Sequence, residues 1–312
     1  MSPSPSRGPL LAVLLAQIAY GLLAMTICIP SMQDWPRTFD ASQAAVQLSF
    51  SGFVIAFGGL QLVYGPLSDR LGRRRVLLVG LALALAGSLL AALAPDLTTL
   101  TAARVLQGAG SAAGMVVGRA MVNDLFDGAE RTRVMAWIGM VMGLVPPLAT
   151  IVGGQLHVHL GWQANFVLMA LLALALALAA WRTMPARPAG APTAAPPHWL
   201  AAMGSAYARL LREPPYLLHV TILGMTTAAF YAFLAGAPIV LAGYGVGPDG
   251  VGFYIMAIPL SYIVGNYLAS RFAQRAGDRR LMRIGQALTV GALLLVIALA
   301  LAGVRSPLAR RR

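Results

Sequence analysis

The residues with the clearest chemical role lie in one loop, which reads Gly65-Pro66-Leu67-Ser68-Asp69-Arg70-Leu71-Gly72-Arg73-Arg74-Arg75. The carboxylate of Asp69 can pair with a guanidinium or with the positive N-terminus of a neighbouring helix. Gly65 and Gly72 allow a tight reversal with closely packed flanks. A generic basic loop would explain the arginines but neither Asp69 nor the glycines, so we interpret the loop as a conformational motif.

A second chemical feature is a charge inside an apolar stretch. Arg104 is the only charged residue within any of the long apolar windows, and an intramembrane charge predicts a functional role. The alternative is that Arg104, about two turns from the end of its segment, extends toward the surface. Gly110, Gly114 and Gly118 follow at intervals of four and predict a bare helix face for close packing.

The elements that must position these residues are long and apolar. Of the 312 residues 58% are hydrophobic and 11% charged, whereas soluble domains carry about a quarter charged residues. Uncharged runs of about 20 residues predict helices that cross a bilayer, because hydrocarbon leaves backbone groups no other partner. Nine windows qualify, of which 97–118 contains the single charge of Arg104: residues 8–33, 41–68, 76–95, 97–118, 134–161, 162–181, 214–248, 250–270 and 284–304. They predict an all-α polytopic membrane protein.

The arginines predict the orientation of these helices. With the N-terminus in the cytoplasm, 17 arginines fall on the inner side, and the outer loops between helices hold only Arg37. The net charge of +13 therefore lies in short loops rather than on one face of a soluble fold, so we expect no nucleic-acid partner. The single cysteine, Cys28, excludes a disulfide framework and a multi-cysteine metal site.

The loop at residues 65–75 closely resembles the G-x-L-x-D-R-x-G-R-R signature of the major facilitator superfamily, and it lies where that family carries it. Residues 47–49, residues 119–126 and Gly161-Trp162 before Phe166 add a similarity to the bicyclomycin/chloramphenicol-type (Bcr/CflA) drug:proton antiporters. The resemblance implies twelve helices in two related halves, a bacterial inner membrane and alternating access to a site near the midplane. It also implies conformational roles for Gly65, Asp69, Arg70, Gly72, Arg73, Arg74, Arg119 and Asp124. Arg119 is expected at the same depth in the membrane as Asp69, which makes it a candidate ion-pair partner of Asp69.

The fifth window resembles the Pro/Gly-rich helix of the family's antiporters. It contains Gly143, Pro146, Gly153 and Gly154, and such residues loosen a helix so that it can flex between states. The match is partial, because the proline expected before the glycine pair is replaced by Thr150 or Ile151. A simple helix kink is the alternative interpretation.

Uncharged polar side chains inside the windows are candidates for a transport pathway, although each could equally make an interhelical hydrogen bond. With Arg104, the candidates are Tyr20, Thr26, Gln47, Gln107, Tyr231 and Asn266, followed by Gln17 and Gln61. His157 and His159 are expected to be solvated in an outer loop. The sequence contains no nucleophile–base–acid set, phosphate loop or metal-ligand cluster, so we expect neither catalysis nor a cofactor or metal.

Coupling to protons requires a carboxylate buried in the membrane. None of the ten acidic residues lies in the middle of a window. Similar antiporters carry a D-x-Y-x-P pattern in the first helix, where this chain has Thr26-Ile27-Cys28-Ile29-Pro30. Thr26 therefore replaces the acid, and Asp34 is expected to be hydrated and a poor substitute for it.

An internal repeat predicts the domain organisation. Residues 274–280 echo residues 69–75 at an offset of 205, and Pro238 echoes Pro30. We predict a six-helix N-terminal bundle at 1–182, a cytoplasmic linker at 183–215 with an amphipathic helix from Trp199 to Arg212, and a partial bundle of three helices at 216–312. On a twelve-helix plan the repeat predicts an end at about residue 387, so we expect nine of twelve helices and a C-terminally truncated chain.

These observations predict a monomeric transporter that exports small, mostly apolar molecules by alternating access coupled to protons. Its expected partners are the lipid bilayer, a small-molecule substrate and protons. Two alternatives remain: a truncated chain that does not transport, and a metabolite symporter or facilitator of the same superfamily.

Overall fold

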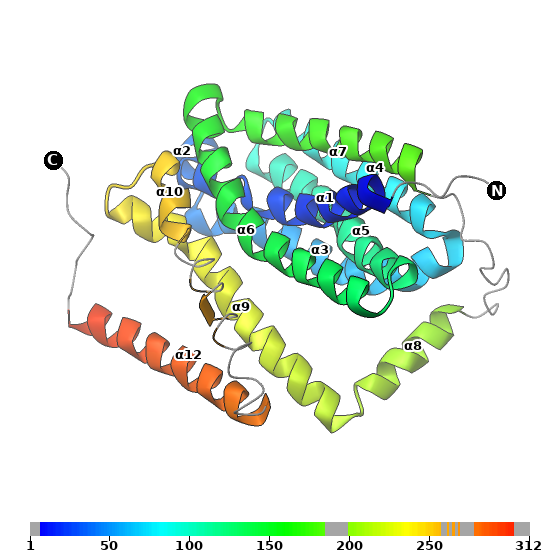
Figure 1. Ribbon diagram of the computed structural model, residues 1–312. Coiled ribbons are helices and arrows are strands. Elements are labelled where there is room, and N and C mark those ends of the chain that lie inside the picture. The colour runs from blue at the N-terminus through cyan, green and yellow to red at the C-terminus, as the bar shows by residue number, and fades with distance from the viewer. Residues whose placement is uncertain are drawn as a thin grey trace. The chain divides into compact units, whose positions relative to one another are not determined.

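A computed structural model describes residues 7–184, 199–256 and 278–302, together with four isolated residues between the last two ranges. The chain divides into two compact units, Met1–Ile255 and Met256–Arg312. Every element in the described part of the chain is a helix (Figure 1). This agrees with the predicted all-α class, whereas the predicted division into bundles at 1–182 and 216–312 stays a prediction.

The helices of the first unit follow one another with short connections. They are α1 (Arg7–Thr26), the 3-10 turn η1 (Pro30–Gln33), α2 (Trp35–Thr38), α3 (Gln43–Leu71), α4 (Arg73–Ala92), α5 (Leu97–Leu125), α6 (Gly128–Leu160), α7 (Gln163–Thr183), α8 (Trp199–Leu210), α9 (Pro214–Gly243) and α10 (Pro248–Ile255). Helix α12 (Asp278–Leu301) belongs to the second unit. Helix α8 falls within the segment predicted to form an amphipathic helix.

Six of these segments are long and apolar enough to cross a membrane. They are Gly8–Gln33, Gln43–Leu71, Arg73–Ala92, Arg133–Leu160, Gln163–Thr183 and Pro214–Gly243. The 29-residue α5, which carries Arg104, Arg119 and Asp124, is not among them. In α12 the apolar segment, Met282–Ala298, is shorter. In the window at 250–270, 10 of the 21 residues lie outside the described part of the chain. The predicted count of nine helices out of twelve is therefore not confirmed.

The helix ends explain how the chain reverses between these segments. The side chain of Ser42 caps α3 by accepting a hydrogen bond from the Ala45 N–H at 3.2 Å. Asp96 caps α5 in the same way, and the hydrogen bonds from the Thr99 N–H and hydroxyl hold the pKa of Asp96 below its usual value. Gly72, with a φ of +94°, ends α3 and precedes α4, a conformation that glycine adopts without strain.

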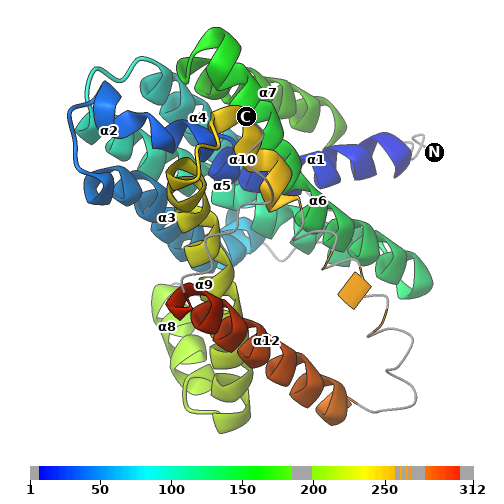
Figure 2. The ribbon, with the colours of Figure 1, turned by 90° about the vertical axis from the view of Figure 1, so that its left-hand side faces the viewer.

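Helix α5 is the centre of the first unit and packs most extensively on α3 and α4, with further packing on α1 (Figures 1 and 2). A Cβ atom at Gly110 would overlap the backbone of Ala84 and Gly80 on α4. A Cβ at Gly114 would lie 2.6 Å from the Gln17 carbonyl on α1, and one at Gly118 would crowd Ile18. The prediction of a bare packing face along α5 is therefore confirmed.

This packing predicts that Gly110→Ala separates α5 from α4 and destabilises the protein by about 1–3 kcal/mol. The matched control is Gly59→Ala on α3, because no atom lies within 4 Å of a Cβ there. Since alanine favours a helix more than glycine, the control should melt at or above the wild-type temperature. Thermal unfolding of the purified variants in detergent measures the difference, and equal melting temperatures for both variants would refute the packing argument.

Candidate functional site

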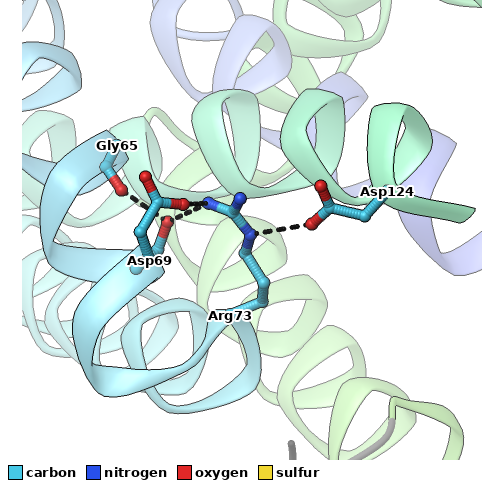
Figure 3. A network of polar contacts seen from close by, with 5 residues as sticks. Gly65, Asp69, Arg73 and Asp124 are labelled. Carbon is cyan, nitrogen blue, oxygen red and sulfur yellow. Dashed lines mark hydrogen bonds and ion pairs between the residues drawn. The ribbon is translucent and has the colours of Figure 1, made fainter. Parts of the chain in front are cut away.

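The conformational motif forms one polar network at the junction of α3, α4 and α5 (Figure 3). A nitrogen of Arg73 lies 2.5 Å from the carboxylate of Asp69, and its Nε donates to Asp124 at 3.1 Å. The same guanidinium donates to the Ser68 hydroxyl at 2.6 Å, which in turn donates to the Gly65 carbonyl. The Arg73 side chain is only 18% exposed. Its guanidinium contacts residues at the ends of α3 and α5 and thereby joins these two ends to the start of α4.

Two further arginines of the motif, Arg119 and Arg74, contact other helices. Arg119 does not pair with Asp69; it donates to the sulfur of Met142 on α6 at 2.9 Å. Arg73 takes that role instead, because the turn at Gly72 places it one helical turn after Asp69. The guanidinium of Arg74 lies 4.5 Å from the ring centroid of Trp181 on α7, a cation–π contact.

The second site surrounds Arg104, which is completely buried within the helical bundle. Its guanidinium donates to the Ala24 carbonyl at 2.7 Å and to the Met25 carbonyl at 3.3 Å. It also lies over the ring of Phe53, 4.2 Å from the centroid, and 5.9 Å from that of Phe166. Among the described residues no carboxylate forms an ion pair with it. The alternative that Arg104 extends to the surface is therefore wrong.

The partners of Arg104 follow from where α1 ends. Ala24 and Met25 lie in the last turn of α1, where carbonyls lack helical donors and carry the negative end of the helix dipole. Gln107 completes the site, since its oxygen accepts from Arg104 at 2.5 Å and its amide donates to the Ser88 hydroxyl at 2.8 Å. The Nε of Arg104 is buried without a partner, which leaves one donor of the site available.

The predicted Pro/Gly-rich helix is one continuous helix, α6, with Pro146 inside it. A Cβ at Gly153 would overlap the carbonyl of Ile27, and one at Gly154 would overlap the backbone of Pro248. These glycines allow α6 to approach the end of α1 and the start of α10 closely. Gly143 lies four residues before Pro147, which has no N–H to donate to its carbonyl. The role of these residues in flexing the helix stays a prediction.

Most of the other predicted pathway residues make interhelical or local hydrogen bonds. Tyr20 donates to the Met169 carbonyl on α7 at 3.3 Å, and Thr26 donates to the Leu22 carbonyl of its own helix at 2.9 Å. The partly buried Tyr231 lies on α9, and Asn266 lies outside the described residues. The structure therefore brings Arg104 and Gln107 together, whereas the hydroxyl of Thr26 is hydrogen-bonded to a backbone carbonyl of α1.

Two glutamines connect the first helices of the chain to α9. Gln47 on α3 donates to the Ala235 carbonyl at 3.0 Å, and Gln33 of η1 donates to the Pro238 carbonyl at 2.6 Å. Gln33 was not among the predicted residues, nor was the buried Asn165, which donates to the Ser31 hydroxyl at 3.1 Å. In the sequence, Gln33 and Asn165 are visible only as polar residues near the ends of apolar windows.

Comparison with known proteins places this arrangement in a family. The family model of the Major Facilitator Superfamily matches residues 10–308. Multidrug resistance protein D of Escherichia coli (strain K12) is 34% identical over 184 residues, 59% of this chain and 47% of that protein. The chloramphenicol resistance protein of Pseudomonas aeruginosa is 28% identical over 300 residues, 93% of this chain and 69% of that protein. The match therefore spans less than half of the first relative and about two thirds of the second.

A solved structure agrees with the fold. The bacterial homologue of the human lysosomal transporter Spinster, in an inward-facing and unoccupied conformation, superposes with a TM-score of 0.67. The sequences are 18% identical, and the superposition covers 88% of this chain and 64% of that one. Fold, signature loop and family match agree, and they identify a transporter rather than an enzyme. The chain belongs to the major facilitator superfamily.

Proposed function

We propose that the protein exports small, mostly apolar molecules, chloramphenicol among them, across a bacterial inner membrane with its N-terminus in the cytoplasm. The observation that carries this proposal is the desolvated Arg104, a polar centre within an apolar bundle that has one donor to spare. The names of the drug-resistance relatives support the choice of substrate. A buried cation without a carboxylate partner favours neutral or anionic molecules that carry hydrogen-bond acceptors.

The proposed mechanism is alternating access. An acceptor oxygen of the substrate takes the vacant Nε–H of Arg104, while Phe53 and Phe166 contact its apolar part. In the proposed orientation, the contacts of Gln33 and Gln47 with α9 close the outer end of the pathway. The Arg73 network at the inner end keeps α3, α4 and α5 together while the bundles move.

Proton coupling is part of this proposal, but it does not run through the usual position in the first helix. Thr26 is buried, and its hydroxyl is hydrogen-bonded to its own helix. A threonine hydroxyl also cannot take up and release a proton as a carboxylate does. The coupling group must therefore lie elsewhere.

The proposal is tested directly by expressing the full chain in an efflux-deficient bacterial host. Resistance to chloramphenicol should rise, and inverted membrane vesicles should accumulate labelled chloramphenicol when energised. Expression in the membrane is confirmed by immunoblot. Unchanged susceptibility and no accumulation despite that expression would contradict export and favour a chain that does not transport.

The contacts of Arg104 predict the effect of Arg104→Lys. Lysine keeps the charge but cannot reach two carbonyls and Gln107 with one planar fork. Loss of a buried hydrogen-bonded contact costs about 1–3 kcal/mol, so the initial rate of chloramphenicol accumulation should fall by about 5- to 150-fold. Arg212→Lys, at an exposed site beyond α8, is the matched control and should transport as the wild type does. Equal accumulation rates for Arg104→Lys and Arg212→Lys would contradict a role of Arg104 in the transport pathway.

The network at Arg73 predicts a second effect on transport. Arg73→Gln leaves Asp69 and Asp124 without their shared cation, so the ends of α3, α4 and α5 are held less firmly. We expect vesicle accumulation of chloramphenicol to fall severalfold, whereas Arg75→Gln, at an exposed position on α4, should leave it unchanged. Similar losses in both variants would indicate that only the positive charge of the loop matters.

A further inference from the structure

A histidine and a carboxylate meet at the end of the bundle that carries η1 and the C-terminus of α6. The Nε2 of His157 lies 2.8 Å from the carboxylate of Asp34. The His157 side chain is 12% exposed and that of Asp34 is 47% exposed. The Nδ1 of His157 is buried without a partner. The expectation that His157 is simply solvated is therefore wrong, since its side chain is largely buried and contacts Asp34, which lies 123 positions away.

The pair lies directly beside a contact with α9. Asp34 follows Gln33, whose amide donates to the Pro238 carbonyl. On the other side of Asp34, Trp35 is fully buried against Phe166 and Trp162 of the α7 end, with ring centroids 6.3 and 6.0 Å away. Asp34 therefore lies between the buried aromatic contacts of Trp35 and the contact of Gln33 with α9.

Other charged groups near this end are more exposed than His157. Arg37 on α2 and Asp40 after it follow Asp34 along the chain, and His159 is exposed on α6 itself. Helix α10, which packs beside α6 in both views, contributes the exposed Asp249 at its start (Figures 1 and 2). The η1 turn has no charged residue of its own, and the first turn of α7 has none. The Asp34 carboxylate is the group in hydrogen-bond contact with His157.

We propose that His157 and Asp34 form a proton-binding site that controls closure of the outer end of the pathway. This inference rests on the proposed alternating-access function and supplies it with a proton-sensitive group. Histidine is the side chain that ordinarily changes charge between about pH 5 and pH 8. A proton taken up by the imidazole gives an imidazolium that donates from Nε2 to the carboxylate, a stronger charge-assisted hydrogen bond. It holds η1 on α6 and keeps Gln33 on the Pro238 carbonyl; loss of the proton loosens both.

The experiment measures closure without measuring transport. Nitroxide labels at Ala44→Cys on α3 and Ala242→Cys on α9, both exposed, report the separation of these helices in nanodiscs, with Cys28 replaced by alanine. In the wild-type background, lowering the pH from about 8 to about 5.5 should raise the ratio of the short to the long distance about fivefold, as expected for one partly exposed charge pair.

Two isosteric variants and one matched control decide the outcome. His157→Gln still donates to Asp34 but cannot take up a proton, and Asp34→Asn keeps its shape without the charge, so both should lose the pH response. His159→Gln, two residues away, should keep it. A wild-type distance that does not respond to pH, or a response that persists in His157→Gln, would overturn the proposal. A normal pH response in a protein that does not export chloramphenicol would instead contradict only the proposed function.

Discussion

The first unit depends on one interaction, the contact between the buried guanidinium of Arg104 and the open carbonyls at the end of α1. A cation inside an apolar bundle is costly unless its donors are satisfied. The last turn of a helix supplies acceptors that have no other partner, at the negative end of the helix dipole. Ala24 and Met25 accept hydrogen bonds from the two terminal nitrogens of Arg104, whose Nε has no partner, and the ring of Phe53 covers one face of the guanidinium. Helix α1 must therefore end where it does, beside α5.

The surrounding structure serves this contact. The glycines of α5 let α1 and α4 approach it closely, so that the Arg104 side chain reaches α1 without crossing solvent or lipid. Because α1 ends at Thr26, the chain continues into η1, whose Gln33 contacts α9, and then into Asp34, which contacts α6. The same central helix carries Asp124 at its other end, where Arg73 binds it. One helix thus connects the polar centre with the Arg73 network at one end of the bundle, and α1 connects it with the opposite end.

Much of this arrangement could be predicted from local patterns. Uncharged windows predict α1, α3, α4, α6, α7 and α9, and the spacing of Asp69, Gly72 and Arg73 predicts a tight, ion-paired turn because its members are neighbours in sequence. Contacts between distant residues could not be predicted in this way. Gln33 and Pro238 are separated by 205 positions, and nothing in their local sequences pairs them. The expected pairing of Arg119 with Asp69 is wrong, because equal depth along two helices does not specify the direction of a side chain.

Hydrogen–deuterium exchange of the protein in nanodiscs tests the role of Arg104 at the end of α1 most directly. If the guanidinium holds this end on α5, the amides of residues 27–34 should exchange faster in Arg104→Gln than in the wild type, while those of α4 stay unchanged. Equal exchange of residues 27–34 in the two proteins would show that the end of α1 is held without Arg104, and would contradict the structural basis of the transport proposal.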